Sequence, residues 1–262
     1  MFDFEEFYKS FHLPYEKSTE IDNLFAEYCN KQGLRKGIEY LQDIGATWLD
    51  IDSYTITYLI NEYTKDALDN AFFNPEDTYE IKSSKYCSYV DKKIRWSIDN
   101  INTKRDVEED TIGYEVLQGK GKVQGKLLGG CIETFVYLIG TPLWPTLDEW
   151  KDKILFIEVS DEEDSELPEY YFAWILRNLE AQGIFNVIKG IIMGKPPVKE
   201  KYDSYKDILF DIVSTDGKHQ DLPIIYNVNF GHAYPIGIIP IGLDCELDCK
   251  NKTITILEKM TK

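Results

Sequence analysis

The sequence has few positive charges for its length. It contains 29 lysine and arginine residues against 46 aspartate and glutamate residues, which gives a formal net charge of −17. A surface with this charge repels phosphate backbones. We therefore do not expect a nucleic acid as a partner.

Signals that direct a chain into or across a membrane are also missing. The first 18 residues, MFDFEEFYKSFHLPYEKS, have neither the basic start nor the apolar core of a signal peptide. No apolar run approaches the roughly 20 residues that a membrane-spanning helix needs. The expectation is a cytoplasmic protein without membrane contact.

Cysteine usage argues against a disulfide framework. The five cysteines are odd in number and scattered along the chain. Cys245 and Cys249 are close in sequence, but no neighbouring histidine completes a ligand set, and structural zinc usually requires four clustered ligands. We expect neither a metal nor another cofactor.

What the chain does contain is apolar and aromatic residues in quantity. Hydrophobic residues make up 43% of the 262 residues and aromatic residues 14%, which is typical of an ordered globular protein. Three regions differ in pattern. Residues 1–65 form a reduced, mainly helical N-terminal region, residues 66–120 are an acidic and aromatic connecting segment, and residues 121–262 alternate strands and helices.

The alternation after residue 121 predicts an α/β fold. We expect a C-terminal sheet of mixed or parallel strands with flanking helices. Apolar runs predict strands at 153–158, 187–194, 223–230, 236–241 and 253–257. Helices are expected at 168–183 and 202–215, and the first should turn Phe172, Ile175 and Leu179 toward the core.

Two polar side chains follow buried strands in this region. Glu158 closes the strand at 153–158, and His232 follows the strand at 223–230 after a glycine. Because strand ends of this kind meet at one edge of an open α/β sheet, the two side chains can converge there. The alternatives are a solvated strand-end carboxylate and an ordinary turn histidine.

Two local patterns near residue 130 are informative. Gly129 and Gly130 stand between an apolar strand and a helix, so their N–H groups could face an anion or a carbonyl oxygen. Close approach of helix and strand is the other explanation. Thr146 and Glu149 have the spacing of a capping box.

Four short motifs resemble one family of serine peptidases. They are LLGGC at 127–131, GTPLWP at 140–145, KILFIE at 153–158 and NFGH at 229–232. In this order they resemble the C-terminal domain of the LD-carboxypeptidases, and most closely the branch of microcin C immunity peptidases. The resemblance covers about residues 66–258.

The resemblance implies a Ser-His-Glu triad. Glu158 would be the carboxylate that orients the histidine, and His232 would be the general base, so we expect the two side chains within hydrogen-bond reach of each other. Trp96, within IRWS at 94–97, is similar to an insertion that lends aromatic side chains to the substrate pocket, although it could equally pack under a loop. Relatives of this kind are often homodimers.

The nucleophile of that triad is missing from its expected context. In the family the serine lies on a sharp turn within a Gly-aromatic-Ser-Asp sequence, and nothing in this chain reproduces it. Ser53 is the nearest candidate, but no glycine beside it permits the strained turn, and it is equally an ordinary strand or turn residue. The N-terminal half therefore looks shortened or replaced.

The predicted function is a serine-type carboxypeptidase that hydrolyses an amide beside a free carboxylate. Its substrate would be a small peptide or a peptidyl nucleotide: the L,D-bond of a cell-wall peptide, or a peptidyl or aminoacyl nucleotide. The alternatives are a non-catalytic binding relative, that is a pseudoenzyme, and a fragment of a split peptidase. Because no serine has the required context, we expect little or no activity from the isolated chain.

Overall fold

The structure is a computed structural model of the chain, and it describes residues 62–89, 106–160 and 167–261. These residues belong to one compact unit. The helices expected in the N-terminal region lie outside the described residues, as do Ser53 and Trp96.

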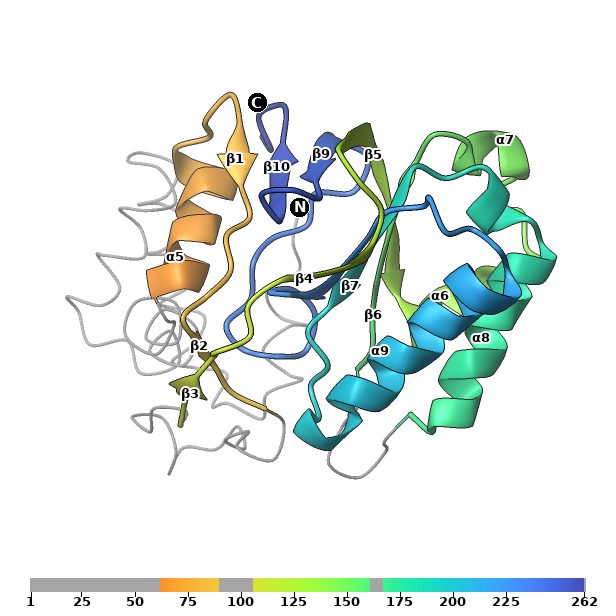
Figure 1. Ribbon diagram of the computed structural model, residues 1–262. Coiled ribbons are helices and arrows are strands. Elements are labelled where there is room, and N and C mark those ends of the chain that lie inside the picture. The colour runs from red at the N-terminus through yellow and green to blue at the C-terminus, as the bar shows by residue number, and fades with distance from the viewer. Residues whose placement is uncertain (1–61, 90–105, 161–166, 262) are drawn as a thin grey trace, which may run out of the picture. The chain divides into compact units, whose positions relative to one another are not determined.

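Eight strands form one mixed, curled sheet in the order β1-β10-β9-β5-β6-β7-β8-β4 (Figure 1). The strands are β1 (Tyr79–Glu80), β4 (Glu115–Gln118), β5 (Lys122–Cys131), β6 (Ile154–Glu158), β7 (Gly190–Gly194), β8 (Ile224–Val228), β9 (Asp244–Asp248) and β10 (Thr253–Ile256). Neighbours from β5 to β8 are parallel, and the remaining pairs are antiparallel. A separate ribbon pairs β2 (Tyr86–Cys87) with β3 (Glu108–Glu109).

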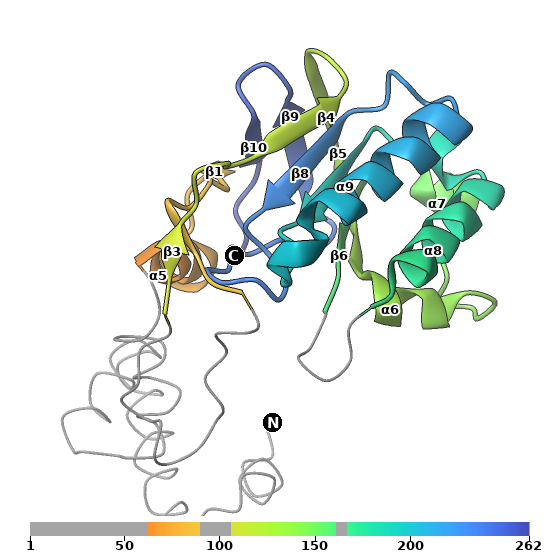
Figure 2. The same ribbon diagram turned by 60° about the horizontal axis from the view of Figure 1, so that its bottom comes forward.

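Four helices cover one side of the parallel strands (Figures 1 and 2). They are α6 (Ile132–Phe135), α7 (Leu147–Trp150), α8 (Glu169–Ala181) and α9 (Tyr202–Phe210), and α9 continues in the wider turns of Asp211–Asp216. Helix α5 (Glu62–Leu68), followed by Asp69–Phe73, lies away from these four, toward β1. Within the described ranges, no helix has the length and apolar character needed to cross a bilayer.

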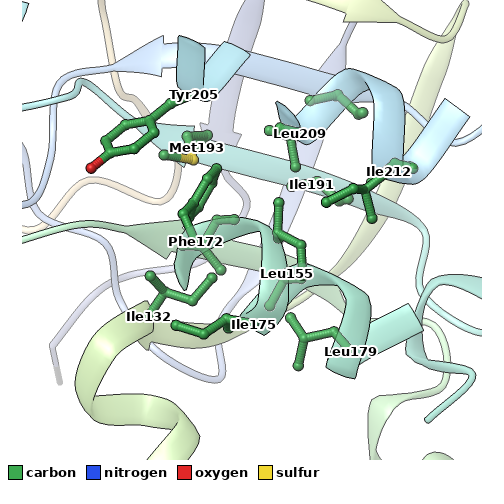
Figure 3. Close-up of a cluster of buried hydrophobic side chains, with 14 of the residues drawn as sticks. Ile132, Leu155, Phe172, Ile175, Leu179, Ile191, Met193, Tyr205, Leu209 and Ile212 are labelled. Carbon is green, nitrogen blue, oxygen red and sulfur yellow. The ribbon is translucent and has the colours of Figure 1, made fainter. Parts of the chain in front are cut away.

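Strands β6, β7 and β8 are buried on both faces, and their side chains alternate between two cores. In β6, Leu155 and Ile157 pack against the helices, whereas Ile154 and Phe156 face the side covered by β9 and β10. Figure 3 shows the helix-side core. Because both faces lack water, these strands read as continuous apolar runs in the sequence.

Strand β5 joins the two parts of the sheet. Its first half pairs antiparallel with β9, and its second half pairs parallel with β6. Gly129 lies where β5 and β6 come closest: a Cβ atom there would stand 1.8 Å from the carbonyl oxygen of Phe156. A larger residue at this position would force the two strands apart.

Most of the predicted C-terminal elements are confirmed. Helix α8 buries Phe172, Ile175 and Leu179, as its apolar stripe predicted. The capping box of α7 is also present, because Glu149 N donates to Thr146 Oγ1 at 3.3 Å and Thr146 N donates to Glu149 Oε2 at 2.8 Å.

The predicted strand at 236–241 is wrong. This stretch has no regular structure, and Gly237 N donates instead to the carbonyl oxygen of Asn229 at 2.6 Å. Pro240 has no N–H group to offer a sheet. The strand that completes this part of the sheet is β9, whose buried Cys245 and Leu247 alternate with acidic residues.

Candidate active site

Two of the predicted site residues lie together at the carboxyl ends of the parallel strands. Glu158 is the last residue of β6, and His232 follows β8. His232 Nδ1 lies 2.8 Å from Glu158 Oε2, so the prediction that the two side chains meet is confirmed. The carboxylate is 11% exposed and the imidazole 43%, which leaves the histidine accessible while its partner is largely withdrawn from water.

This contact sets the chemistry of the imidazole. An ionised carboxylate can only accept, so Nδ1 carries the proton and Nε2 is the basic nitrogen. If His232 takes up a second proton, the imidazolium is stabilised by the negative charge beside it. The pair is therefore suited to general base catalysis.

Gly231 makes room for this pair. Its backbone has a φ of 91°, in the left-handed region that favours glycine, and a Cβ atom would lie 2.6 Å from Oε2 of Glu158. The glycine before His232 therefore both turns the chain and keeps space for the carboxylate.

Glu133 fixes the chain just beyond Glu158. From the start of α6, its Oε1 accepts hydrogen bonds from the N–H and the hydroxyl of Ser160, at 2.7 and 3.0 Å. Its other oxygen lies 3.0 Å from Sγ of Cys131. No local sequence pattern indicates this role, because the contact spans 27 residues.

Cys131 lies beside Glu158 and is a second candidate for the nucleophile, because the two residues are paired in register at the ends of β5 and β6. Burial raises the pKa of its thiol to about 12, together with the hydrogen bond to Glu133 and the charges of Glu158 and Glu133. Only the thiolate is a strong nucleophile. At neutral pH the Cys131 thiol is protonated, and it acts as a hydrogen-bond donor.

The double glycine lies differently from the sequence prediction. Gly129 and Gly130 are still within β5, paired with Phe156 and Ile157, and α6 begins only at Ile132. The close approach required at Gly129 is therefore between two strands. A substrate-binding role for these glycines stays a prediction, as do the roles of Ser53 and Trp96.

Comparison with known proteins shows which family this part of the chain is similar to. Residues 124–247 match the LD-carboxypeptidase C-terminal domain. A Treponema pallidum protein named as a carboxypeptidase is 33% identical to this chain over 144 residues. These residues make up 55% of this chain and 40% of the Treponema protein. The microcin C7 self-immunity protein MccF of Escherichia coli is 25% identical over 174 residues, 65% of this chain and 46% of its own length. The chain thus spans less than half the length of these two relatives.

Solved structures show the same fold. An MccF-like protein from Streptococcus pneumoniae, crystallised in complex with AMP, superimposes with a TM-score of 0.65 at 29% sequence identity. The match covers 76% of this chain and 59% of that one. It thus extends over much of the described part of the chain.

Proposed function

Since residues 124–247 of this chain belong to the LD-carboxypeptidase family as its C-terminal domain, we propose that the chain supplies the histidine and glutamate of a Ser-His-Glu peptidase site. His232 is the general base, and Glu158 orients it. The reaction is hydrolysis of an amide beside a free carboxylate. The observation that carries the proposal is the 2.8 Å contact between His232 Nδ1 and the withdrawn carboxylate of Glu158.

The geometry supports a separate role for each of the two side chains in the reaction. His232 Nε2 takes the proton of a serine hydroxyl as its oxygen attacks the amide carbonyl, and Glu158 stabilises the imidazolium. The imidazolium then gives this proton to the leaving amine, which leaves an acyl-enzyme. Water hydrolyses that ester in a second cycle of the same base. The serine itself is not assigned in this chain.

The substrate is proposed to be a small peptide or a peptidyl nucleotide. Support comes from the MccF-like relative that was crystallised with AMP and from the immunity protein matched in sequence. An aminoacyl or peptidyl nucleotide joins such a nucleotide to an amino acid, and a muropeptide with an L,D-bond offers the same amide beside a carboxylate. A cytoplasmic location and a homodimer stay predictions.

Two variants test the role of His232. Purified chain is incubated with an L,D-linked muropeptide and with a peptidyl nucleotide, and cleavage is followed by mass. Little or no turnover is expected from the isolated chain, and any turnover that it shows should be abolished by His232→Ala. The control is His219→Ala, because His219 forms a second histidine–glutamate pair, with Nε2 2.9 Å from Glu180 Oε2, and has no proposed catalytic role. Measurable turnover that is equal in the two variants would contradict the proposal.

A second candidate is a non-catalytic binding relative or one part of a split peptidase. It is favoured by the absence of a Gly-aromatic-Ser-Asp turn from the whole sequence. The serine closest in sequence to Glu158, Ser160, has its hydroxyl engaged with Glu133. This candidate predicts binding of AMP by calorimetry without turnover of either substrate, and turnover by the chain alone would exclude it.

A further inference from the structure

A buried lysine stands at the end of β7, outside the pair described above. The side chain of Lys195 is 1% exposed, and its Nζ lies 2.6 Å from Asp110 Oδ2 and 2.7 Å from Asn227 Oδ1. A buried ammonium group requires such partners, since an unpaired charge away from water is very costly. Lys195 is therefore held by Asp110 and Asn227, and of these two Asp110 carries the opposite charge.

Asp110 connects this lysine to the β2–β3 ribbon, which is at the lower left of Figure 1. It directly follows β3, and its N–H donates to the carbonyl oxygen of Lys85 at 2.9 Å. Its Oδ1 accepts from the N–H groups of Ile112 and Gly113, both at 3.1 Å. Each carboxylate oxygen thus has a partner, and the side chain fixes the ribbon to the end of β7.

The ribbon in turn contacts the chain on both sides of His232. Before the histidine, Asn229 Oδ1 accepts from Ser84 N at 2.9 Å. After it, Ser88 N donates to Tyr234 O at 2.9 Å, and Tyr234 N donates to Ser88 O at 3.2 Å. The turn that carries His232 is held at two points by residues 84–88.

We propose that Lys195 and Asp110 are positioning residues that keep His232 against Glu158 by anchoring the β2–β3 ribbon. The inference rests on the proposed role of His232. Its physical basis is that a turn fixed at Asn229 and Tyr234 has little freedom to swing the imidazole away, and the ribbon that fixes it is itself attached to β7 through one buried ion pair.

The test removes the ion pair without leaving a buried charge. In the double variant Lys195→Met, Asp110→Asn, the amide still accepts from Ile112 and Gly113, but the link to β7 is gone. The matched control is Lys189→Met, Asp152→Asn. That lysine and aspartate are 3.0 Å apart and half exposed. Lys189 directly precedes β7 and Asp152 lies just before β6, so this pair is at the amino ends of the strands rather than at their carboxyl ends.

Nitrogen-15 NMR of the histidine side chains gives a readout that needs no catalysis. In the unaltered chain His232 should show one tautomer, with the proton on Nδ1, and His232→Ala assigns its signals among the three histidines. We expect this single-tautomer signature to be lost in the Lys195/Asp110 variant and kept in the control. A folded Lys195/Asp110 variant that keeps it would overturn the inference.

A measurement on the unaltered chain covers the case in which the double variant does not fold. Amide hydrogen exchange should show Ser88, Asp110 and Tyr234 opening as one unit, because each depends on the ribbon. Exchange at Asp110 while Tyr234 stays protected would show that ribbon and turn open separately, and it would refute the inference. Absence of turnover in the unaltered chain bears only on the catalytic proposal, because neither measurement uses substrate.

Discussion

Gly231 and Glu158 are so close that only a residue without a side chain fits between the carboxylate and the turn. The atom that a Cβ at Gly231 would crowd, Oε2 of Glu158, is the one that contacts His232 Nδ1. The positions of the carboxylate, the glycine and the histidine therefore depend on one small space at the carboxyl ends of the strands. A change at the glycine should affect the other two directly.

Gly231→Ala is expected to destabilise the fold by about 1 to 3 kcal/mol from backbone strain, with an added cost from displacing Glu158. Gly242→Ala separates these effects. Gly242 also has a positive φ, of 84°, but a Cβ there would meet nothing within 4 Å. Urea unfolding should show a larger loss of free energy for Gly231→Ala, and equal losses would contradict the crowding.

Leu179→Ala should lower the free energy of unfolding by about 2 to 5 kcal/mol, because Leu179 is buried between α8 and the sheet. The matched control is Leu143→Ala, since Leu143 is 75% exposed, and its change should stay within about 0.5 kcal/mol. Chemical denaturation measures both. A small effect at Leu179 would mean that α8 packs through a different face.

Alkylation of Cys131 by iodoacetamide should be slow at pH 8. With a thiol pKa of about 12, on the order of one molecule in ten thousand carries a thiolate at that pH. Glu133→Gln should speed the reaction, because it removes one of the negative charges that oppose ionisation. Mass spectrometry follows the modification, with Glu169→Gln, on α8, as the control. Rapid labelling of the unaltered chain would reopen Cys131 as a nucleophile.

Acid should weaken the fold partly through Asp110. Burial raises the pKa of this carboxyl, but the hydrogen bond and charge of Lys195 and the N–H groups of Gly113 and Ile112 outweigh it, and the pKa lies below its ordinary value. A lowered folded-state pKa gives stability that is present above the unfolded-state pKa of about 4 and is lost as pH falls further.

The measurement is the free energy of unfolding between pH 2 and 7. The unaltered chain should lose more stability below about pH 4 than the Lys195→Met, Asp110→Asn variant, which has no carboxyl at position 110. Lys189→Met, Asp152→Asn again provides the control for an exposed pair. Identical acid slopes in the unaltered chain and the Lys195/Asp110 variant would show that the buried pair has no such effect.

The sequence predicted those parts of the fold whose signals are local. The stripe that includes Phe172, Ile175 and Leu179 predicted α8 and its buried face, and the run of apolar residues before Glu158 predicted β6. Such inferences need only the periodicity of neighbouring residues. The contact of Glu158 with His232 spans 74 residues, and its prediction needed the triad that the family resemblance implies in addition to the positions of the two residues after buried strands.

The errors and omissions concern contacts between distant residues. Apolar residues at 236–241 indicated a strand, but the backbone at Gly237 is used by Asn229. Strand β9 was not predicted, because Asp244, Glu246 and Asp248 leave no apolar run in it. Their charges are tolerated since they pair with lysines of β5. The ion pair between Lys195 and Asp110 joins residues 85 positions apart, and no local sequence pattern indicates it.

The order of the strands has a consequence for dividing the chain. Both outermost strands, β1 and β4, come from residues before 120, although the six strands between them all follow that point. A fragment beginning at residue 121 would leave β8, whose five residues are all buried, with its hydrogen-bonding groups open along one side. Such an edge recruits other chains and leads to aggregation. Residues 79–80 and 115–118 thus protect the two outer edges of the sheet, and separate production of the C-terminal region should retain them.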